Sequence, residues 1–246
     1  MSDPTLGDLL SEAEERRPSL TVYGAVDSAL LGQFETRNVT VERRPLPEVI
    51  DEEFVVLRDG DRFRCAIGRE RLDGFLSPPI RAPWDLDLLP PEYRSLFELL
   101  DDTVFGSLNR RQLLAASREL EGQAYRRGRG TLRVGFQSVV AFREQEPTYR
   151  RLADETDLDV HVYAVPDAPT DDLPVWPATF HTEPAEQIGR YWFLLFDASE
   201  DDTDEDDTDE DEWSFALVAE EREAGTFSGF WTFERAIVDR AVRTLA

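Results

Sequence analysis

The sequence predicts an α/β protein with a mixed, partly antiparallel sheet flanked by helices. Strand-like segments alternate with amphipathic helical segments, an order that favours parallel neighbouring strands. The turn dipeptide Asp59-Gly60 between two strand-like runs predicts an antiparallel hairpin. Hydrophobic residues make up 41% of the 246 residues, enough to form the core of one large domain or two small ones.

The first half of the chain carries a helix, two strands around a further helix, a hairpin and a third helix. The pattern predicts helices at 6–17, 28–34 and 69–76 and strands at 21–25, 39–43, 53–58 and 62–67. The first helix places Leu6, Leu9 and Leu10 on one face. Residues 78–91 contain five prolines around Trp84 and predict an extended connector.

The second half continues with the same two kinds of element. The pattern predicts helices at 92–100, 109–127, 147–154 and 233–245, a helical turn at 186–190, and strands at 132–140, 159–165, 192–197, 213–220 and 226–232. The helix at 109–127 has a stripe of Leu113, Ala116, Leu120 and Ala124, and Gly128 ends it. Residues 166–184 predict a proline-rich loop.

Two regions follow from this order: an N-terminal α/β region with its connector at 1–91, and a second domain at 92–246. Residues 200–212 form an acidic insert between two strands and repeat DDTDE in tandem. We interpret the insert as a solvated loop, because a calcium loop needs a glycine at its sharp turn. The two halves also suggest an internal duplication of a β-α-β-hairpin-α unit, with chance similarity of a common order as the alternative.

Charge and composition narrow the class of protein. The net charge is -25, from 52 acidic and 27 basic residues, and every basic residue is Arg. Carboxylates without Lys predict a halophilic cytosol, where salt screens their repulsion. The acidic balance argues against direct nucleic-acid binding. Cys65 is the only cysteine, and the sequence predicts no disulfide, signal peptide or membrane span.

Residues that could carry catalysis are sparse, and we expect no enzyme. The only histidines, His161 and His181, belong to no recognisable motif, and we predict structural or solvent-facing roles for both. They make a weak case for a metal site, and no phosphate-binding glycine loop is present. The sequence therefore names no cofactor.

The second half is rich in aromatic residues, and there we place a candidate ligand site. Its predicted members are Phe136, Gln137, Tyr149, His161, Tyr163, Trp176, Arg190, Trp192 and Trp231. A pocket is expected beside Gly135 and Gly189, with Gln137 facing it and Phe136 in the core, or the reverse. Arg190 would bind an anionic group. The alternatives are an ordinary aromatic core and a salt bridge from Arg190 to a local carboxylate.

Several runs of the second half resemble the DICT domain of haloarchaeal sensory proteins. They occupy 117–142, 148–167, 189–197, 215–221 and 227–239. The resemblance implies a cytoplasmic module that senses light, a small ligand or another input. It also implies relay to a separate signalling partner of the two-component or cyclic-nucleotide type. A pure adaptor and an enzyme of unknown class are the alternatives. No GGDEF sequence or kinase glycine box is present.

Overall fold

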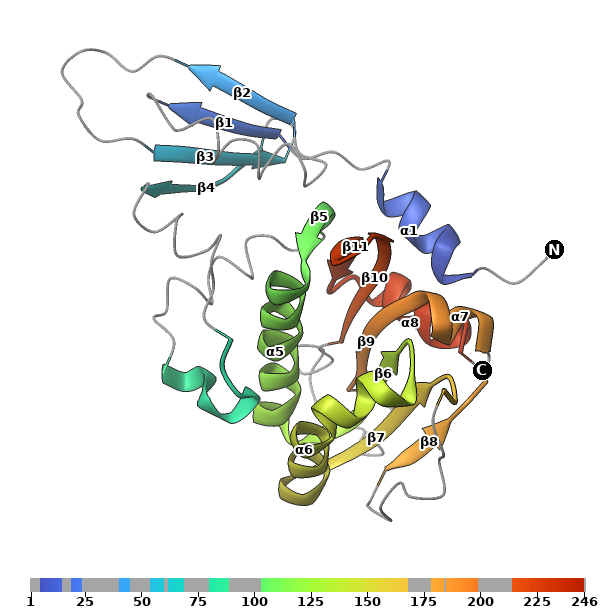
Figure 1. Cartoon of the computed structure of the whole chain (residues 1–246). Helices are drawn as coiled ribbons and strands as arrows, with labels where there is room; N and C mark the ends of the chain where they lie inside the picture. Colours follow the sequence, from blue (N-terminus) through green and yellow to red (C-terminus); the bar gives the residue numbers. More distant parts are fainter. Residues whose placement is uncertain are drawn as a thin grey trace.

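The computed structural model forms two separate β-sheets with helices (Figure 1). It describes residues 5–14, 19–23, 40–44, 54–59, 62–68, 80–88, 103–167, 178–183, 185–198 and 214–245. The larger sheet has seven strands in the order β5-β11-β10-β9-β6-β7-β8. The predicted fold class, a mixed α/β protein, is confirmed.

Strands of the larger sheet run in mixed directions. They are β5 (Thr103–Asn109), β6 (Arg129–Phe136), β7 (Asp157–Ala164), β8 (Thr179–His181), β9 (Tyr191–Asp197), β10 (Phe215–Glu223) and β11 (Thr226–Thr232). The neighbours from β5 through to β6 are antiparallel, and β6, β7 and β8 are parallel. The parallel neighbours β6 and β7 are joined through α6, because parallel strands need a crossover connection.

Helices cover both faces of this sheet (Figure 1). One face packs on α5 (Arg110–Arg127) and α6 (Val139–Glu155), and the other on α1 (Leu6–Glu14), α7 (Ala185–Arg190) and α8 (Arg235–Arg243). Alternating side chains of each strand enter the two cores. In β9, for example, Trp192 and Leu194 face the α5 side, while Phe193 and Leu195 face the α8 side.

The helix α5 follows its sequence signals closely. The Asn109 side chain accepts a hydrogen bond from the Gln112 backbone, and the Gln112 side chain accepts one from the Asn109 backbone. This reciprocal cap satisfies backbone donors that no helical carbonyl reaches. At the other end Gly128 takes φ +73, a left-handed conformation that glycine adopts without strain. The predicted bounds of this helix are confirmed.

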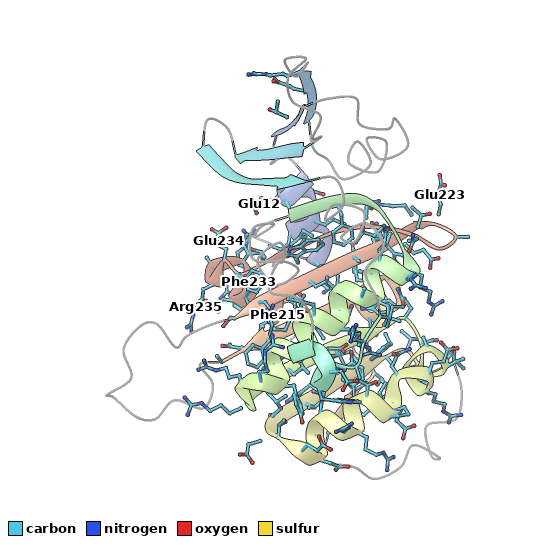
Figure 2. All side chains as sticks on the ribbon, turned by 90° about the vertical axis from the view of Figure 1, so that its left-hand side faces the viewer. Glu12, Phe215, Glu223, Phe233, Glu234 and Arg235 are labelled. Carbon is cyan, nitrogen blue, oxygen red and sulfur yellow. The ribbon has the colours of Figure 1, made fainter. Side chains whose placement is uncertain are left out.

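The helix α1 lies far away in sequence from the elements that it packs against. Its Leu6, Leu9 and Leu10 are fully buried against the α8 side of the sheet. The Gln187 side chain accepts a hydrogen bond from the Leu6 backbone at 3.1 Å and donates one to the Thr244 carbonyl at 3.0 Å. Glu12, labelled in Figure 2, pairs with Arg240 of α8 at 2.8 Å.

Aromatic packing closes the sheet beside the start of α8. Phe215 of β10 and Phe233 meet edge to face with their ring centres 6.4 Å apart (Figure 2). The Thr232 hydroxyl accepts a hydrogen bond from the Glu234 backbone just before the helix begins. The predicted helix at 233–245 is therefore confirmed with its first regular turn at Arg235.

The smaller sheet contains β1 (Ser19–Tyr23), β2 (Thr40–Arg44), β3 (Phe54–Asp59) and β4 (Arg62–Gly68). Its order is β2-β1-β3-β4, with β1 parallel to β2 and the other pairs antiparallel. The strands β7-β6-β9-β10 of the larger sheet have the same order and the same directions. The shared topology supports an internal duplication, which stays a prediction.

Some boundaries differ from the sequence prediction. Strand β6 ends at Phe136, and α6 begins at Val139 instead of near Pro147. The Ser138 hydroxyl accepts a hydrogen bond from the Ala141 backbone and so starts the helix early. Pro147 lies inside the helix. The connector forms a 3-10 helix, η1 (Pro83–Leu88), which packs on α5.

Two strands were not predicted: β5, and the three-residue β8 inside the expected loop at 166–184. The helices expected at 28–34, 69–76 and 92–100 lie outside the described residues, as does the acidic insert. The division at residue 91 stays a prediction.

Candidate functional site

The two histidines of the chain meet at the β7–β8 edge of the larger sheet. Strand β7 alternates, so that Leu158, Val160 and Val162 enter the core beside α6. Its other side chains, including His161 and Tyr163, face the opposite side. In the register of β8, Tyr163 lies opposite His181. The sheet therefore brings together two side chains that lie 20 residues apart in the sequence. We call His161 and His181 the histidine pair.

Hydrogen bonds join this pair to a carboxylate. The Nδ1 atom of His161 is 2.8 Å from Nε2 of His181, and Nε2 of His161 is 2.9 Å from Oδ2 of Asp159. The two imidazole rings are nearly parallel, with centres 5.1 Å apart. The Tyr163 ring stacks on His181 at 4.4 Å. Each histidine side chain is therefore held in place by contacts with neighbouring side chains.

Electrostatics around the pair disfavour a protonated His181. Partial burial lowers the pKa of His181, and the nearby charges of His161 and Arg133 lower it further. Asp159 opposes these effects. Arg133 lies opposite His161 in the register of β6 and β7, which explains its influence. The pair therefore favours the neutral form of His181 near neutral pH.

The predicted pocket beside Gly135 is occupied by a side chain. A methyl group at Gly135 would lie 2.1 Å from the Phe193 ring, so this ring fills the space that the missing side chain leaves. Strands β6 and β9 are also hydrogen-bonded neighbours. At Gly189 a methyl group would meet only Val165, at 3.3 Å.

Four predicted site residues lie in the core on the α5 side. Phe136, Tyr149, Trp192 and Trp231 are each at most 8% exposed. Phe136 contacts Phe142, Tyr149 and Trp192 with ring centres 5.5 to 6.3 Å apart. Phe136 therefore occupies the core, as the favoured prediction had it. Gln137 follows β6 and is half-buried.

A second polar cluster lies between α5 and α6. The Arg118 guanidinium donates to Glu121 and to Gln145, and the Tyr149 hydroxyl donates to the other oxygen of Glu121. Glu121 is 1% exposed and Arg118 is 6% exposed. We call these residues the buried ion cluster: Arg118, Glu121, Gln145 and Tyr149. It holds a charged pair in a place where an unpaired charge would be costly.

Burial decides the titration of this cluster. Removal from water raises the pKa of Glu121, while the charge of Arg118 opposes the increase. Burial also raises the pKa of Tyr149 well above its ordinary value, and the charge of Glu121 adds to this effect. The Tyr149 hydroxyl therefore remains protonated and donates to the carboxylate of Glu121.

The predicted site residue Arg190 joins neither cluster. Arg190 donates from Nε to Glu220 at 2.7 Å, and Arg222 pairs with the other oxygen of Glu220 at 2.9 Å. The salt bridge that we considered as an alternative for Arg190 is therefore present. Trp176 lies outside the described residues.

Sequence reasoning missed His181 as a site residue, and also Arg118 and Glu121. The signal for His181 was weak, because three residues of strand inside a proline-rich loop give no clear alternation. Arg118 and Glu121 lie on α5, a helix whose bounds were predicted. Its polar Ser117, Arg118, Glu119 and Glu121 are buried together with its apolar stripe, since neighbours cover the helix on several sides.

Metal-binding clusters and membrane-spanning helices are absent from the described part of the chain. No group of three or more His, Cys, Asp or Glu side chains there could hold a metal ion. No described helix is long and apolar enough to cross a membrane.

The fold is a mixed α/β fold that carries two polar clusters, the histidine pair and the buried ion cluster. Residues 93–221 match the family model DICT, described as a sensory domain in diguanylate cyclases and two-component systems. This match covers just over half of the 246 residues, and the chain belongs to the DICT family. Neither the search of curated proteins nor the search of solved structures gave a match.

Proposed function

We propose that this chain is a sensory module that binds a small ligand or other input and relays it to a separate signalling protein. The observation that carries the proposal is the family match, because the matched residues contain both the histidine pair and the buried ion cluster. The family is a sensory one, which is consistent with a role without catalysis. A cytoplasmic location is part of the proposal.

We assign the ligand-binding site to the histidine pair and Tyr163. The His161 side chain is 20% exposed, so a molecule from solvent can reach it. Parallel rings beside a carboxylate and Arg133 offer stacking, hydrogen bonds and charge to one ligand. This assignment keeps His161 and Tyr163 from the predicted site and adds His181.

The other predicted residues stay proposals as ligand contacts, and most of them would need a local rearrangement to reach a ligand. Phe136, Tyr149, Trp192 and Trp231 are packed in the core, so a ligand would touch them only if α5 and α6 moved apart. Arg190 would have to exchange Glu220 for the ligand. Gln137, at the end of β6, and Trp176 complete the predicted set.

Relay to a partner would pass through α6. This helix follows β6 and precedes β7, so a displacement of β7 acts on it directly. The buried ion cluster ties α6 to α5 through Gln145 and Tyr149. Buried polar groups must keep their partners, and this favours a few discrete arrangements of two helices over a continuous range.

The pure adaptor is a weaker hypothesis. It would be favoured by a contiguous exposed apolar patch. Ile80 and Val140 are the large exposed hydrophobic side chains of the described residues, and single exposed side chains of this kind are ordinary.

Analysis of the purified protein tests the proposal. Protein isolated under native conditions should carry, or acquire from a metabolite extract, a small molecule that mass spectrometry detects after denaturation. Replacement of Tyr163 by Leu should reduce the bound amount at least tenfold, whereas Tyr125→Leu, at a partly buried position on α5, should not. Protein that takes up nothing, yet still captures a signalling partner, would support the adaptor instead.

A further inference from the structure

The hydrogen bonds of the histidine pair determine where its protons are. A neutral imidazole has one N–H donor and one acceptor nitrogen. Asp159 can only accept, so Nε2 of His161 carries the proton and Nδ1 of His161 is the acceptor. The Nε2 atom of His181 must then donate across the 2.8 Å contact. Its Nδ1 atom is left as the acceptor of the pair.

This arrangement tolerates one added proton and not two. A proton on Nδ1 of His181 leaves its Nε2–H free to donate to His161. A second proton must go to Nδ1 of His161, and both nitrogens of the 2.8 Å contact are then donors. Two imidazolium ions would also face each other beside Arg133. The hydrogen bond between β7 and β8 side chains is lost at that step.

Strand β8 is short, and this bond is one of its side-chain contacts with the rest of the sheet. It has three residues and pairs with β7 through the positions of His161, Val162 and Tyr163. Its side-chain anchors are Phe180, which meets the Phe142 ring in the core, and His181 between His161 and Tyr163. Of these two side-chain contacts, the one made by His181 can gain a proton.

We propose that the histidine pair is a proton-binding site through which this module reads pH, with β8 held on the sheet until the second proton binds. The inference rests on the proposed sensory function in one respect, namely that proton binding serves as the signal that the module senses. Proton binding and the response of β8 are properties of the chain alone. A bound organic ligand and a signalling partner are not needed for either.

The charged groups around the pair set the direction of the response. Asp159 on β7 favours protonation, and Arg133 on β6 opposes it. Glu183 follows β8, two residues after His181. On α7, Arg190 is held by Glu220 and attracted by Glu186. Because the pKa of His181 is lowered in the folded chain, the unfolded chain binds this proton more readily.

The sign of the pH dependence follows from this difference. The stabilisation from a neutral His181 is complete above the ordinary histidine pKa of about 6.5 and is lost as the pH falls through the lowered folded pKa. The two imidazoles share one hydrogen bond, so a proton added to one ring changes the bonding of the other. We therefore expect β8 to loosen on the acidic side.

Nuclear magnetic resonance of the full chain tests the site directly. The chain contains two histidines, so every imidazole signal comes from the pair. At neutral pH, nitrogen-15 spectra should show the Nε2–H tautomer for both rings. A titration from pH 8 to pH 4.5 at constant potassium chloride should show two coupled steps. Over the same range, hydrogen exchange at 179–181, corrected for intrinsic rates, should increase at least tenfold relative to β6.

Three variants separate the proposal from general acid unfolding. His181→Gln keeps a side-chain N–H donor that cannot become charged, so β8 exchange should no longer depend on pH. His161→Gln should have the same effect and serves if the first variant folds poorly. Asp159→Asn, on the same strand face, should keep the response and shift both titration steps to lower pH.

Two results would overturn the inference. One is independent titration, in which replacing either histidine leaves the other titration curve unchanged. The other is a wild-type β8 whose corrected exchange does not change with pH. Neither result affects the search for a bound small molecule, so a failure here and a failure of the proposed function can be told apart.

Discussion

At the scale of single residues, Glu121 has a fully buried side chain between α5 and α6. Its carboxylate is fully buried and accepts from both Arg118 and Tyr149. We predict that Glu121→Ala lowers the free energy of unfolding by about 3–5 kcal/mol, because it leaves the Arg118 charge buried without its carboxylate. Urea denaturation followed by tryptophan fluorescence measures the change.

A matched pair on the surface is the control. Arg151 and Glu155 are also joined on one helix, but their side chains are 43% and 40% exposed. Glu155→Ala should change the free energy of unfolding by at most about 1 kcal/mol. Equal effects of Glu155→Ala and Glu121→Ala would contradict the importance of burial.

The sequence identified aromatic residues of the second half, but it did not show which of them lie in contact. The aromatic set was found, yet Phe136, Tyr149 and Trp192 are core residues on one face, whereas His161 and Tyr163 face the other. Alternation within a strand is visible in a sequence. Which strand lies next to it is not, so the meeting of His161 with His181 could not be predicted.

At the scale of elements, the N-terminal helix α1 packs on elements from the C-terminal part of the chain. Leu6, Leu9 and Leu10 are at most 2% exposed and pack with Tyr191 and Val238. We predict that removing residues 1–14 lowers the melting temperature by several degrees and increases binding of a hydrophobic dye, because an apolar face becomes exposed. Differential scanning fluorimetry and dye fluorescence measure both effects.

Charge at the same contact should matter much less. Glu12 pairs with Arg240 at a partly exposed position. Glu12→Gln keeps the helix and its leucines, so it should leave the melting temperature within about one degree of the wild type. A large effect of Glu12→Gln would place the stability of this contact in the ion pair and not in the apolar face.

Elements with strong local signals were predicted well, and those without them were not. The helix α5 has a capping residue, a stripe and a terminal glycine, and each signal agrees with the others. By contrast, Val139 and Val140 extend a strand-like run, and the cap at Ser138 converts them into the first turn of α6. A local hydrogen bond decided this boundary against residue preference.

The acidic insert connects two strands that the structure places side by side. Strands β9 and β10 pair in antiparallel register, with Phe196 opposite Phe215. We predict that replacing 201–211 by a short turn changes the free energy of unfolding by at most about 1–2 kcal/mol, since the cost of loop closure depends weakly on length. Thermal denaturation in high salt tests this, and a variant that fails to fold there would contradict it.

At the scale of the whole molecule, the charge of -25 without Lys is the dominant property. We predict that thermal stability increases from dilute buffer to multimolar potassium chloride, because salt shortens the range of repulsion between carboxylates from tens of Å to about 3 Å. Circular dichroism melting curves at both extremes measure it. Equal melting temperatures would argue against a halophilic protein.

Topology at this scale relates the two sheets. The strands β2-β1-β3-β4 repeat the order and directions of β7-β6-β9-β10. The larger sheet then adds β11 and β5 beyond β10. Both histidines lie in the second half of the sequence, so the proposed input site belongs to that half alone.

The position of β11 bears on how such a module can be inherited and recombined. The matched family segment ends at residue 221, inside β10, while β11 lies between β10 and β5. A gene fragment limited to 93–221 would encode β5 without the strand that joins it to the rest of the sheet. The segment that matches the family model is therefore smaller than the segment that forms the complete sheet, and fusion proteins built from this domain should retain the chain through α8.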